Sequence, residues 1–408
     1  MFDVNKIRSD FPMIVNNPNL IYFDSAATSF KPQCVIDEVV NYYEHLNCNI
    51  HRGDYDISYI VSKTYDDTRK TVAHFINAQR AESIVFTYGA TSSLNTVAIN
   101  AAKKFLKKGD VILTSQVEHA SDIIPWFNAA EVSGASIRYV PFKKDAKFDL
   151  QAYEECFADG KVKLVALPHV SNVMGYIYPV KEITRIAHEY GAIVTIDGAQ
   201  SVPHIKVDVQ DLDIDFLSFS SHKMLGPGGV GVLYGRFELL DQLDPIFYGG
   251  GSNARFYQDG TVILQKTPEK FEAGTPCIEG VLGLKKAIEY LESVSMEEVE
   301  AYGAQLSDYF IEKLLKLDNV EVYNEGSKAG IVTFNVKGIF AQDAASYFNK
   351  LGIAVRTGNH CAKLLNNIIE VNETIRASMY LYNTKEEIDR FVDVIKDTTI
   401  EKCVDSIL

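Results

Sequence analysis

Residues 193–223 read IVTIDGAQSVPHIKVDVQDLDIDFLSFSSHK. Within this stretch the apolar run Ile193–Ile196 leads into Asp197, and the apolar run Phe216–Phe219 leads toward Lys223. Short apolar runs bounded by polar turns are typical of strands buried on both faces, as in a parallel sheet. Ligands collect beyond the carboxyl ends of such strands. The stretch therefore predicts two parallel strands that bring a carboxylate and an amine to one edge of a sheet.

The same pattern continues toward the N-terminus. The further apolar runs, each interpreted as a buried strand, are Ser83–Thr87, Val111–Thr114 and Leu164–Leu167. Stretches with helical periodicity separate the runs, among them Thr91–Lys107 and Val180–Tyr190. This alternation of strand and helix predicts an α/β fold with a mostly parallel central sheet flanked by helices.

Beyond about residue 290 the alternation changes. The elements predicted there are helices over 296–317 and 341–351, strands over 330–336, 354–357 and 374–382, and a last helix opened by the capping box of Thr384 and Glu387. This mixture indicates a smaller α+β C-terminal domain. We expect a large domain over residues 20–285 and a small domain formed by residues 1–19 and 286–408.

The composition and charge of the chain argue against several classes of protein. The chain has 408 residues, 47% hydrophobic and 23% charged, and a net charge of −14, which disfavours nucleic acid or an anionic membrane as a partner. No basic start followed by an apolar region, and no run of about 18 apolar residues, is present, so we expect a cytoplasmic protein. The six cysteines have no CxxC or metal-ligand spacing, which indicates reduced thiols and no metal site.

Polar side chains follow each predicted strand. In chain order these groups are Tyr88–Thr91 (YGAT), Glu118 and His119, Pro168–Asn172 (PHVSN), Asp197–Gln200 (DGAQ) and Ser220–Lys223 (SSHK). Together they would bring an anion cradle, an imidazole, amides, a carboxylate and an amine into one crevice. Pyridoxal phosphate (PLP) requires such a set, because an amine bonds to its aldehyde and a carboxylate keeps its ring nitrogen protonated.

The PLP hypothesis assigns a role to each residue. Lys223 would supply the amine and Asp197 the carboxylate, while His119 would stack on the ring. The ring hydroxyl oxygen would be hydrogen-bonded by Asn172 and Gln200, and the phosphate by Ser220, His222 and the amides of Ala90 and Thr91. Taken singly these residues have simpler interpretations, since a carboxylate after a strand is often a helix N-cap and a loop lysine is usually solvated. Their joint occurrence in this order favours the cofactor.

One glycine-rich stretch has a different interpretation. Gly226–Gly231 (GPGGVG) satisfies the GxGxxG spacing, yet it leads into the apolar run Val232–Tyr234 rather than into a helix. A dinucleotide-binding fingerprint requires strand, turn and helix. We therefore interpret these glycines as a turn after Lys223.

The chain resembles the fold-type I PLP enzymes of aminotransferase class V, and within them the SUF-type (group II) cysteine desulfurases. The resemblance extends over essentially the whole chain, through YFDSAAT (22–28), HRG (51–53), EH (118–119), IPW (124–126), HVSNVMG (169–175), DGAQS (197–201), SSHK (220–223), GGG (249–251), FEAGTP (271–276), RTGNHCA (356–362) and RASMYLYNT (376–384). It implies a homodimer in which Thr275 reaches the PLP phosphate of the partner. It also implies that L-cysteine is bound by Arg376, Asn172, Ala27 and Arg356.

The resemblance further implies the chemistry. L-Cysteine would become L-alanine, with Lys223 as the base at Cα, His119 in proton transfer and Cys361 as the nucleophile that becomes a persulfide. Positive charge would favour the thiolate of Cys361, and His360 and Arg356 are the nearby sources in the sequence. The short segment between Arg356 and Cys361 is similar to that of group II members, which hand sulfur to a small acceptor protein of the SUF system for iron–sulfur cluster assembly.

Departures and alternatives remain. The family's usual residues are replaced at Asn359, Ser221 and Lys363–Leu365, and the stretch 54–67 also diverges. A selenocysteine lyase or a cysteine sulfinate desulfinase would share every residue named, whereas a plain class V aminotransferase would not need Cys361. A non-catalytic scaffold for sulfur transfer would need neither Cys361 nor Lys223.

Overall fold

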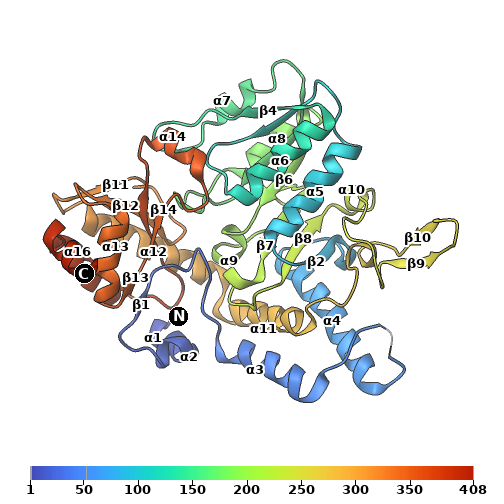
Figure 1. The fold of residues 1–408 in the computed structure, drawn as a ribbon, viewed down its shortest axis with the longest axis horizontal. Coiled ribbons are helices and arrows are strands. Elements are labelled where there is room, and N and C mark those ends of the chain that lie inside the picture. Colours follow the sequence, from blue (N-terminus) through green and yellow to red (C-terminus); the bar gives the residue numbers. More distant parts are fainter. Residues whose placement is uncertain (1, 52, 408) are drawn as a thin grey trace.

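A seven-stranded sheet forms the centre of the large domain. The computed structural model describes residues 2–51 and 53–407, and the strand order in this sheet is β2-β8-β7-β6-β5-β3-β4. The strands are β2 (Ile84–Thr87), β3 (Val111–Thr114), β4 (Ser136–Tyr139), β5 (Val162–Pro168), β6 (Ile193–Asp197), β7 (Phe216–Ser220) and β8 (Gly231–Gly235). Strand β8 runs in the opposite direction to the other six strands of this sheet. The predicted mostly parallel sheet is confirmed (Figure 1).

The sheet separates two apolar cores because successive strand residues point to opposite faces. On β5, Leu164 and Ala166 pack in one core, whereas Val165 and Leu167 pack in the other. Helices α5 (Ala90–Lys104) and α6 (Ala120–Ser133) cover the first face. The remaining large-domain helices are α3 (Gln33–Asn41), α4 (Asp56–Phe75), α7 (Leu150–Glu155), α8 (Val180–Glu189), α9 (Ser201–His204), α10 (Phe237–Leu240) and α11 (Ile278–Val294).

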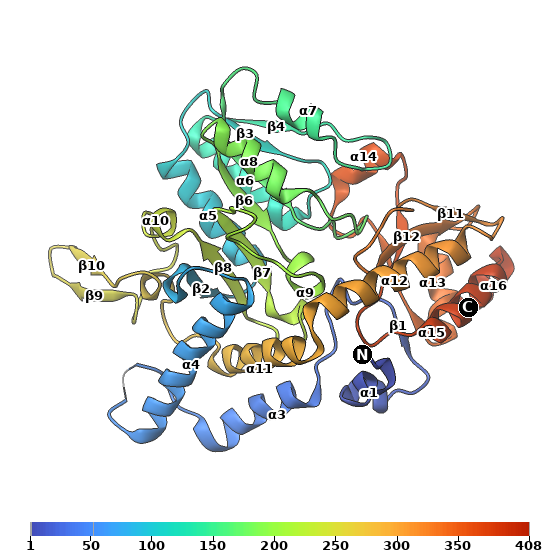
Figure 2. The same ribbon diagram turned by 180° about the vertical axis from the view of Figure 1, so that it is seen from behind.

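A four-stranded antiparallel sheet forms the small domain, in the order β11-β12-β15-β14. Its strands and helices are β11 (Val320–Val322), β12 (Ile331–Val336), β14 (Arg356–Gly358), β15 (Thr374–Ser378), α12 (Met296–Leu314), α13 (Ala341–Lys350), α14 (Asn366–Ile369), α15 (Lys385–Lys396) and α16 (Ile400–Ile407). Phe310, Phe334 and Phe391 meet in its core. Figure 2 shows α11 leading into α12, which carries the chain from the large domain to the small one.

The N-terminal segment contacts both cores. Helices α1 (Val4–Ser9) and α2 (Pro12–Val15) precede β1 (Ile21–Tyr22), which pairs in parallel with β13 (Ile353–Ala354). Ile7 and Phe11 pack with the large-domain core, whereas Ile21 and Phe23 pack with the small-domain core. The division at residue 20 stays a prediction, and the chain crosses between the two cores close to it.

Several predicted boundaries differ from the structure. The strand predicted over 374–382 ends at Ser378, because Asn383 Oδ1 accepts the Tyr380 amide at 2.8 Å and turns the chain into the large core. The helix predicted over 91–107 ends at Lys104. The capping box of Thr384 and Glu387 is confirmed at the start of α15.

One hairpin was not predicted. It consists of β9 (Asn253–Phe256) and β10 (Val262–Leu264), and it projects from the large domain in Figure 1. Phe256 and Ile263 are exposed on it. Among the described residues no helix is long and apolar enough to cross a membrane. Arg52 of the HRG motif lies outside the described residues.

Candidate active site

A cavity of about 210 Å³ lies at the carboxyl ends of the sheet strands, between the two domains. Every predicted site residue except Thr275 lines it: Ala27, Ala90, Thr91, His119, Asn172, Asp197, Gln200, Ser220, His222, Lys223, Arg356, Cys361 and Arg376. The large domain contributes the strand-end residues, and the small domain contributes Arg356, Cys361 and Arg376 from the β14–β15 region. The structure therefore brings these residues together as the sequence predicts.

Lys223 ends a short 3₁₀ turn that follows β7. Burial, together with the charges of Arg376 and Arg356, lowers the pKa of its amine to about 8 against the opposing effect of Asp197. At pH 7 about one such amine in ten is uncharged, far more than for an ordinary lysine. Lys223 can therefore act as a nucleophile or as a base.

The backbone before Lys223 is held by an unusual number of donors. The carbonyl oxygen of His222 accepts hydrogen bonds from the Ser29 amide at 3.0 Å, Ser29 Oγ at 3.2 Å, Thr28 Oγ1 at 3.1 Å and Lys31 Nζ at 3.2 Å. Burial lowers the pKa of Lys31 to about 8. Residues 28–31, at the end of the YFDSAAT segment and just beyond it, thus fix the peptide that carries the reactive amine, a role that no sequence motif indicated.

Asp197 is buried at the end of β6. Its Oδ1 accepts the Ala199 amide at 2.8 Å, and burial raises the pKa of the carboxyl against the effects of that bond and of Lys223. Beside it, Gln200 Nε2 donates to the Ala26 carbonyl at 2.8 Å, and Gln200 Oε1 is buried without a partner among the described residues. A buried acceptor without a partner is costly unless a ligand satisfies it. A ligand that donates a hydrogen bond to Gln200 Oε1 would remove this cost.

The turn from β2 into α5 has the features of an anion cradle. Gly89 has φ +146°, and the Ala90 amide at the start of α5 donates to Ser220 Oγ at 2.8 Å. A Cβ at Gly231 on β8 would lie 2.3 Å from the Gly89 Cα, so only glycine allows this approach. The helix dipole favours an anion here.

His119 is the N-cap residue of α6. Its Nδ1 accepts the Ser121 amide at 3.1 Å, so in the neutral ring the proton lies on Nε2. Burial, together with the positive charges of Lys223, Arg376 and Arg356, lowers the pKa of His119 to about 4. The imidazole is therefore neutral near pH 7, and only Nε2 is free to exchange a proton.

Arg376 is buried on β15. Its Nη1 donates to the Asn172 carbonyl at 2.9 Å and its Nη2 pairs with Asp24 at 3.0 Å. Its Nε is buried without a partner among the described residues. Asp24 belongs to the YFDSAAT motif, but its contact with Arg376 could not be predicted from the motif.

Cys361 is exposed on a strained loop between β14 and α14. Both His360 (φ +49°) and Cys361 (φ +58°) adopt the left-handed conformation that non-glycine residues rarely occupy. Two hydrogen bonds hold their carbonyl oxygens: Asn172 Nδ2 donates to His360 at 2.8 Å, and the Ala120 amide donates to Cys361 at 2.6 Å. The side chain of Cys361 is therefore accessible from outside the protein.

His360 does not supply the positive charge that was expected for the Cys361 thiolate. It is buried, and burial together with Arg376 and Arg356 lowers its pKa to about 3. A neutral imidazole cannot stabilise a neighbouring thiolate by charge. Of the two expected sources of positive charge, only Arg356 remains.

Comparison with known proteins identifies the family. The model of the aminotransferase class-V family matches residues 21–391. The chain belongs to this family. A probable cysteine desulfurase of Halalkalibacterium halodurans is 42% identical over 399 residues, covering 97% of this chain and 98% of that protein. One of Staphylococcus epidermidis is 42% identical over 402 residues, covering 97% of each chain.

Solved structures place the fold within the fold-type I PLP enzymes. The apo cysteine desulfurase of Thermococcus onnurineus NA1 superposes with a TM-score of 0.92 at 38% identity, covering 96% of this chain and 97% of that one. The cysteine desulfurase CsdA of Escherichia coli gives 0.91 at 32% identity, covering 99% of each chain. This class V enzyme thus has cysteine desulfurases as relatives in both sequence and structure.

Beneath His119, the class V enzyme carries a pair of carboxyl groups that the sequence did not single out. Ser115 Oγ donates to Glu118 Oε1 at 2.5 Å, and Trp126 Nε1 donates to Asp122 Oδ1 at 3.0 Å. Glu118 Oε2 and Asp122 Oδ2 are buried and lack other partners among the described residues. Burial raises the pKa of both carboxyl groups well above the usual range; the charge of Asp122 raises that of Glu118 further, and the charge of Asp197 raises that of Asp122. A proton held between the two free oxygens would satisfy both.

Thr275 lies apart from the other site residues of the class V enzyme. It lines a separate cavity of about 570 Å³ together with Asn49 and His51, and Asn49 Nδ2 donates to Thr275 Oγ1 at 3.2 Å. None of the residues that line this cavity also lines the cavity that contains Lys223. Its expected contact with a PLP of the partner stays a prediction.

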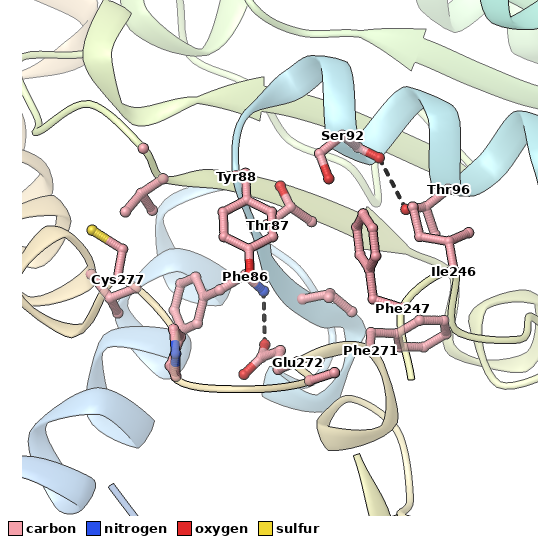
Figure 3. A pocket seen from close by; sticks show the side chains of 16 residues that line it. Phe86, Thr87, Tyr88, Ser92, Thr96, Ile246, Phe247, Phe271, Glu272 and Cys277 are labelled. Atoms are coloured by element: carbon pink, nitrogen blue, oxygen red, sulfur yellow. Dashed lines mark hydrogen bonds between the residues drawn. The ribbon is translucent and has the colours of Figure 1, made fainter. Parts of the chain in front are cut away.

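Figure 3 shows a mostly apolar pocket next to Thr275, and none of the active-site residues named above lines it. Phe86, Phe247 and Phe271 line it, and its single carboxylate, Glu272, accepts the Phe86 amide at 2.8 Å. That carboxylate is also bound bidentately by Arg69 at 2.8 and 2.9 Å. Among the described residues no cluster of side chains could hold a metal ion.

Proposed function

We propose that this protein is a PLP-dependent cysteine desulfurase, which converts L-cysteine to L-alanine and leaves a persulfide on Cys361. The observation that carries the proposal is the strained Cys361 loop, which is bonded to Asn172 and to the α6 N-terminus at the rim of the cavity that contains Lys223 and Arg376. A plain class V aminotransferase would need no thiol at this position.

The residues of the cavity fit PLP. Lys223 offers an amine with a lowered pKa, Asp197 a buried carboxylate for a ring nitrogen, and Gln200 Oε1 an acceptor for the ring hydroxyl. The Gly89–Thr91 turn, Ser220 and His222 would hold the phosphate. Bound there, PLP supplies an electron sink for negative charge at the substrate's Cα. One N–H of the Asn172 side-chain amide donates to the His360 carbonyl, which leaves its second N–H for the ring hydroxyl oxygen.

Arg376 would bind the substrate carboxylate. Its Nε is the buried donor without a protein partner, and guanidinium groups bind carboxylates strongly. Arg356, exposed at the mouth of the cavity, adds positive charge near Cys361. Ala27, next to the Ala26 carbonyl that holds Gln200, keeps the wall small enough for the amino acid.

Two side chains would move protons. Lys223, with its pKa near 8, would take the proton from Cα as general base. His119 would exchange a proton with the substrate thiol through Nε2, because Nδ1 is occupied by the Ser121 amide.

Sulfur transfer would then occur at Cys361. The thiolate of Cys361 forms a bond to the substrate sulfur while the Cβ–S bond breaks, and the electron pair of that bond stays with the carbon skeleton. Protonation of that skeleton gives L-alanine. Overall, L-cysteine and the thiol give L-alanine and a persulfide, with no external oxidant or reductant.

We also propose that the enzyme works as a cytoplasmic homodimer and hands its sulfur to a small acceptor protein of the SUF system, for iron–sulfur cluster assembly. The position of Thr275 outside its own chain's cavity supports a site completed by a second subunit. The exposure of Cys361 supports transfer to another protein.

The test uses the purified protein loaded with PLP. Alanine and sulfur should form from L-cysteine in equal amounts, and mass spectrometry should find one extra sulfur atom on the peptide that contains Cys361. Cys361→Ala should abolish alanine formation while keeping the visible absorbance of bound PLP, and Lys223→Ala should lose both. Cys34→Ala, which removes another exposed thiol, is the matched control and should behave like the unmodified protein. Pyruvate in place of alanine would contradict the proposal.

A further inference from the structure

We infer that His360 is a positioning residue that sets the distance between the Cys361 thiol and the carboxylate-binding guanidinium of Arg376. The inference rests on the proposed function, because it concerns how the nucleophile is placed for a substrate held at Arg376. His360 lines the same cavity, but in this role its imidazole acts through the Cys361 loop and not on the substrate or cofactor.

The first contact is made by the imidazole of His360. Its Nε2 lies 2.9 Å from Thr374 Oγ1 and 3.2 Å from the Thr374 carbonyl oxygen. Thr374 begins β15, two residues before Arg376 on the same strand, and pairs with Gly358 of β14. The ring therefore ties the Cys361 loop to the strand that carries the arginine.

The second contact is made by the carbonyl of His360. Asn172 Nδ2 donates to it at 2.8 Å, and the carbonyl of Asn172 accepts Nη1 of Arg376 at 2.9 Å. These bonds close a circuit from Arg376 through Asn172 to His360, and from His360 through Thr374 back to Arg376. A circuit closed at both ends fixes the peptide before Cys361 more tightly than either contact alone.

The loop needs such anchors. His360 and Cys361 are consecutive left-handed residues, a conformation that persists only where surrounding contacts impose it. Cys361 has an exposed side chain, whereas the imidazole of His360 is buried and so provides the packing that its neighbour lacks.

The charged groups that face the His360 imidazole decide whether it acts on the loop by hydrogen bonding or on the Cys361 thiol by charge. Arg376 and Arg356 both act on His360, and they keep the imidazole neutral together with its burial. A neutral ring with its proton on Nε2 donates to Thr374, which leaves Nδ1 without a partner among the described residues. His360 therefore holds the loop by hydrogen bonding and burial and does not activate the thiol by charge.

The experiment compares three variants of the PLP-loaded enzyme. His360→Phe keeps a planar ring but removes the bond to Thr374. In His360→Gln the side-chain amide places an N–H donor at a similar distance from the backbone as the imidazole Nε2. Thr374→Val removes Oγ1 without changing the size of the side chain and leaves the 3.2 Å contact with the carbonyl. His74→Phe, on the exposed side of α4, is the matched control.

Hydrogen exchange is the first measurement, because it does not depend on activity. In the wild type the Ala362 amide donates to the Asn359 carbonyl at 2.7 Å, so it reports on the order of the loop. We expect exchange of the peptide covering 359–366 to rise about tenfold in His360→Phe, to rise less in Thr374→Val, and to return toward wild type in His360→Gln. Should His360→Phe fail to fold by circular dichroism, Thr374→Val carries the same test.

Kinetics and thiol titration are the second measurements. We expect kcat of His360→Phe to fall about 100-fold, as for a misplaced reacting group, with KM for L-cysteine changed less than about threefold. The pH at which Cys361 becomes half-reactive toward iodoacetamide should not move. A shift of that pH would overturn the inference in favour of a charge effect. Wild-type exchange and kcat in both His360→Phe and Thr374→Val would also overturn it. If the wild type itself makes no alanine, the proposed function fails, and the exchange measurement still decides the role of the ring.

Discussion

At the scale of single residues, the site is dominated by groups whose burial changes their charge. Lys223, His119 and His360 all have lowered pKa values because they are desolvated near Arg376 and Arg356. Near pH 7 the two imidazoles are uncharged and the Lys223 amine is uncharged in part, and all three lie near the guanidinium of Arg376. Lys223 and His119 can therefore exchange protons without accumulating positive charge in the cavity, whereas the neutral His360 is hydrogen-bonded to Thr374.

The Glu118–Asp122 pair allows a prediction about pH. Both folded-state pKa values are raised, so the native protein keeps a proton that the unfolded chain loses above about pH 4. The unfolded state then binds fewer protons than the native state, and stability falls as pH rises. In Asp122→Asn the amide can donate to Glu118 Oε2, so no proton has to be held.

We therefore expect the melting temperature of Asp122→Asn, relative to wild type, to be higher at pH 8 than at pH 5. Differential scanning calorimetry at the two pH values measures this difference. Asp318→Asn, at an exposed position, serves as control and should show no such change. An equal effect of Asp122→Asn at both pH values would argue against the shared proton.

A second prediction concerns the anion cradle. In Gly231→Ala the new Cβ would meet the Gly89 backbone at 2.3 Å, so the β2–α5 turn must move. Gly228→Ala, in the same glycine-rich turn, has no atom within 4 Å of its new Cβ. We expect Gly231→Ala to weaken PLP binding at least tenfold, measured by absorbance titration, while Gly228→Ala binds as wild type. Equal binding by both variants would show that the turn does not hold the phosphate.

At the scale of elements, strands β2, β3, β5, β6 and β7 could be predicted because each is a largely buried apolar run, whereas the edge strand β4 (SIRY) is partly exposed and was not predicted. Val111–Thr114 has the same bounds in prediction and structure, and the polar residues after the strands meet in one cavity. The two-residue pairing of Ile21 with Ile353 could not be predicted, because it joins segments more than 300 residues apart without a periodic signal. The neutral state of His360 could not be predicted from the sequence either, because the burial that lowers its pKa arises only in the folded protein.

One buried ion pair joins two elements next to Thr275. Arg69 on α4 binds Glu272 bidentately, and both side chains are less than a tenth exposed. Tyr65 also donates to this carboxylate at 3.1 Å. Removing one charge of a buried pair leaves the other uncompensated, which costs more than the pair contributes.

Glu272→Gln should therefore lower the free energy of unfolding by about 3 kcal/mol, as measured by urea denaturation. Glu269→Gln changes an exposed side chain of the same segment and should have little effect. A loss as small for Glu272→Gln as for Glu269→Gln would mean that Arg69 finds another partner or water.

At the scale of the whole molecule, the question is which chain completes which site. Thr275 lies outside the cavity of its own Lys223, so in the proposed homodimer it would serve the partner's cofactor. In Thr275→Glu the added negative charge would repel the phosphate at that site. A heterodimer of Lys223→Ala with Thr275→Glu then concentrates both defects in one site and leaves the other site intact.

We expect each parent homodimer to be inactive and the purified heterodimer, isolated through two different affinity tags, to recover about half of the wild-type activity per dimer. If Thr275 served its own chain, each site of the heterodimer would carry one defect and no activity would return. A mixture of unmodified and Lys223→Ala subunits is the control, because its heterodimer also keeps one intact site in either case. The recovery of activity therefore decides whether one chain of this enzyme can complete a site alone.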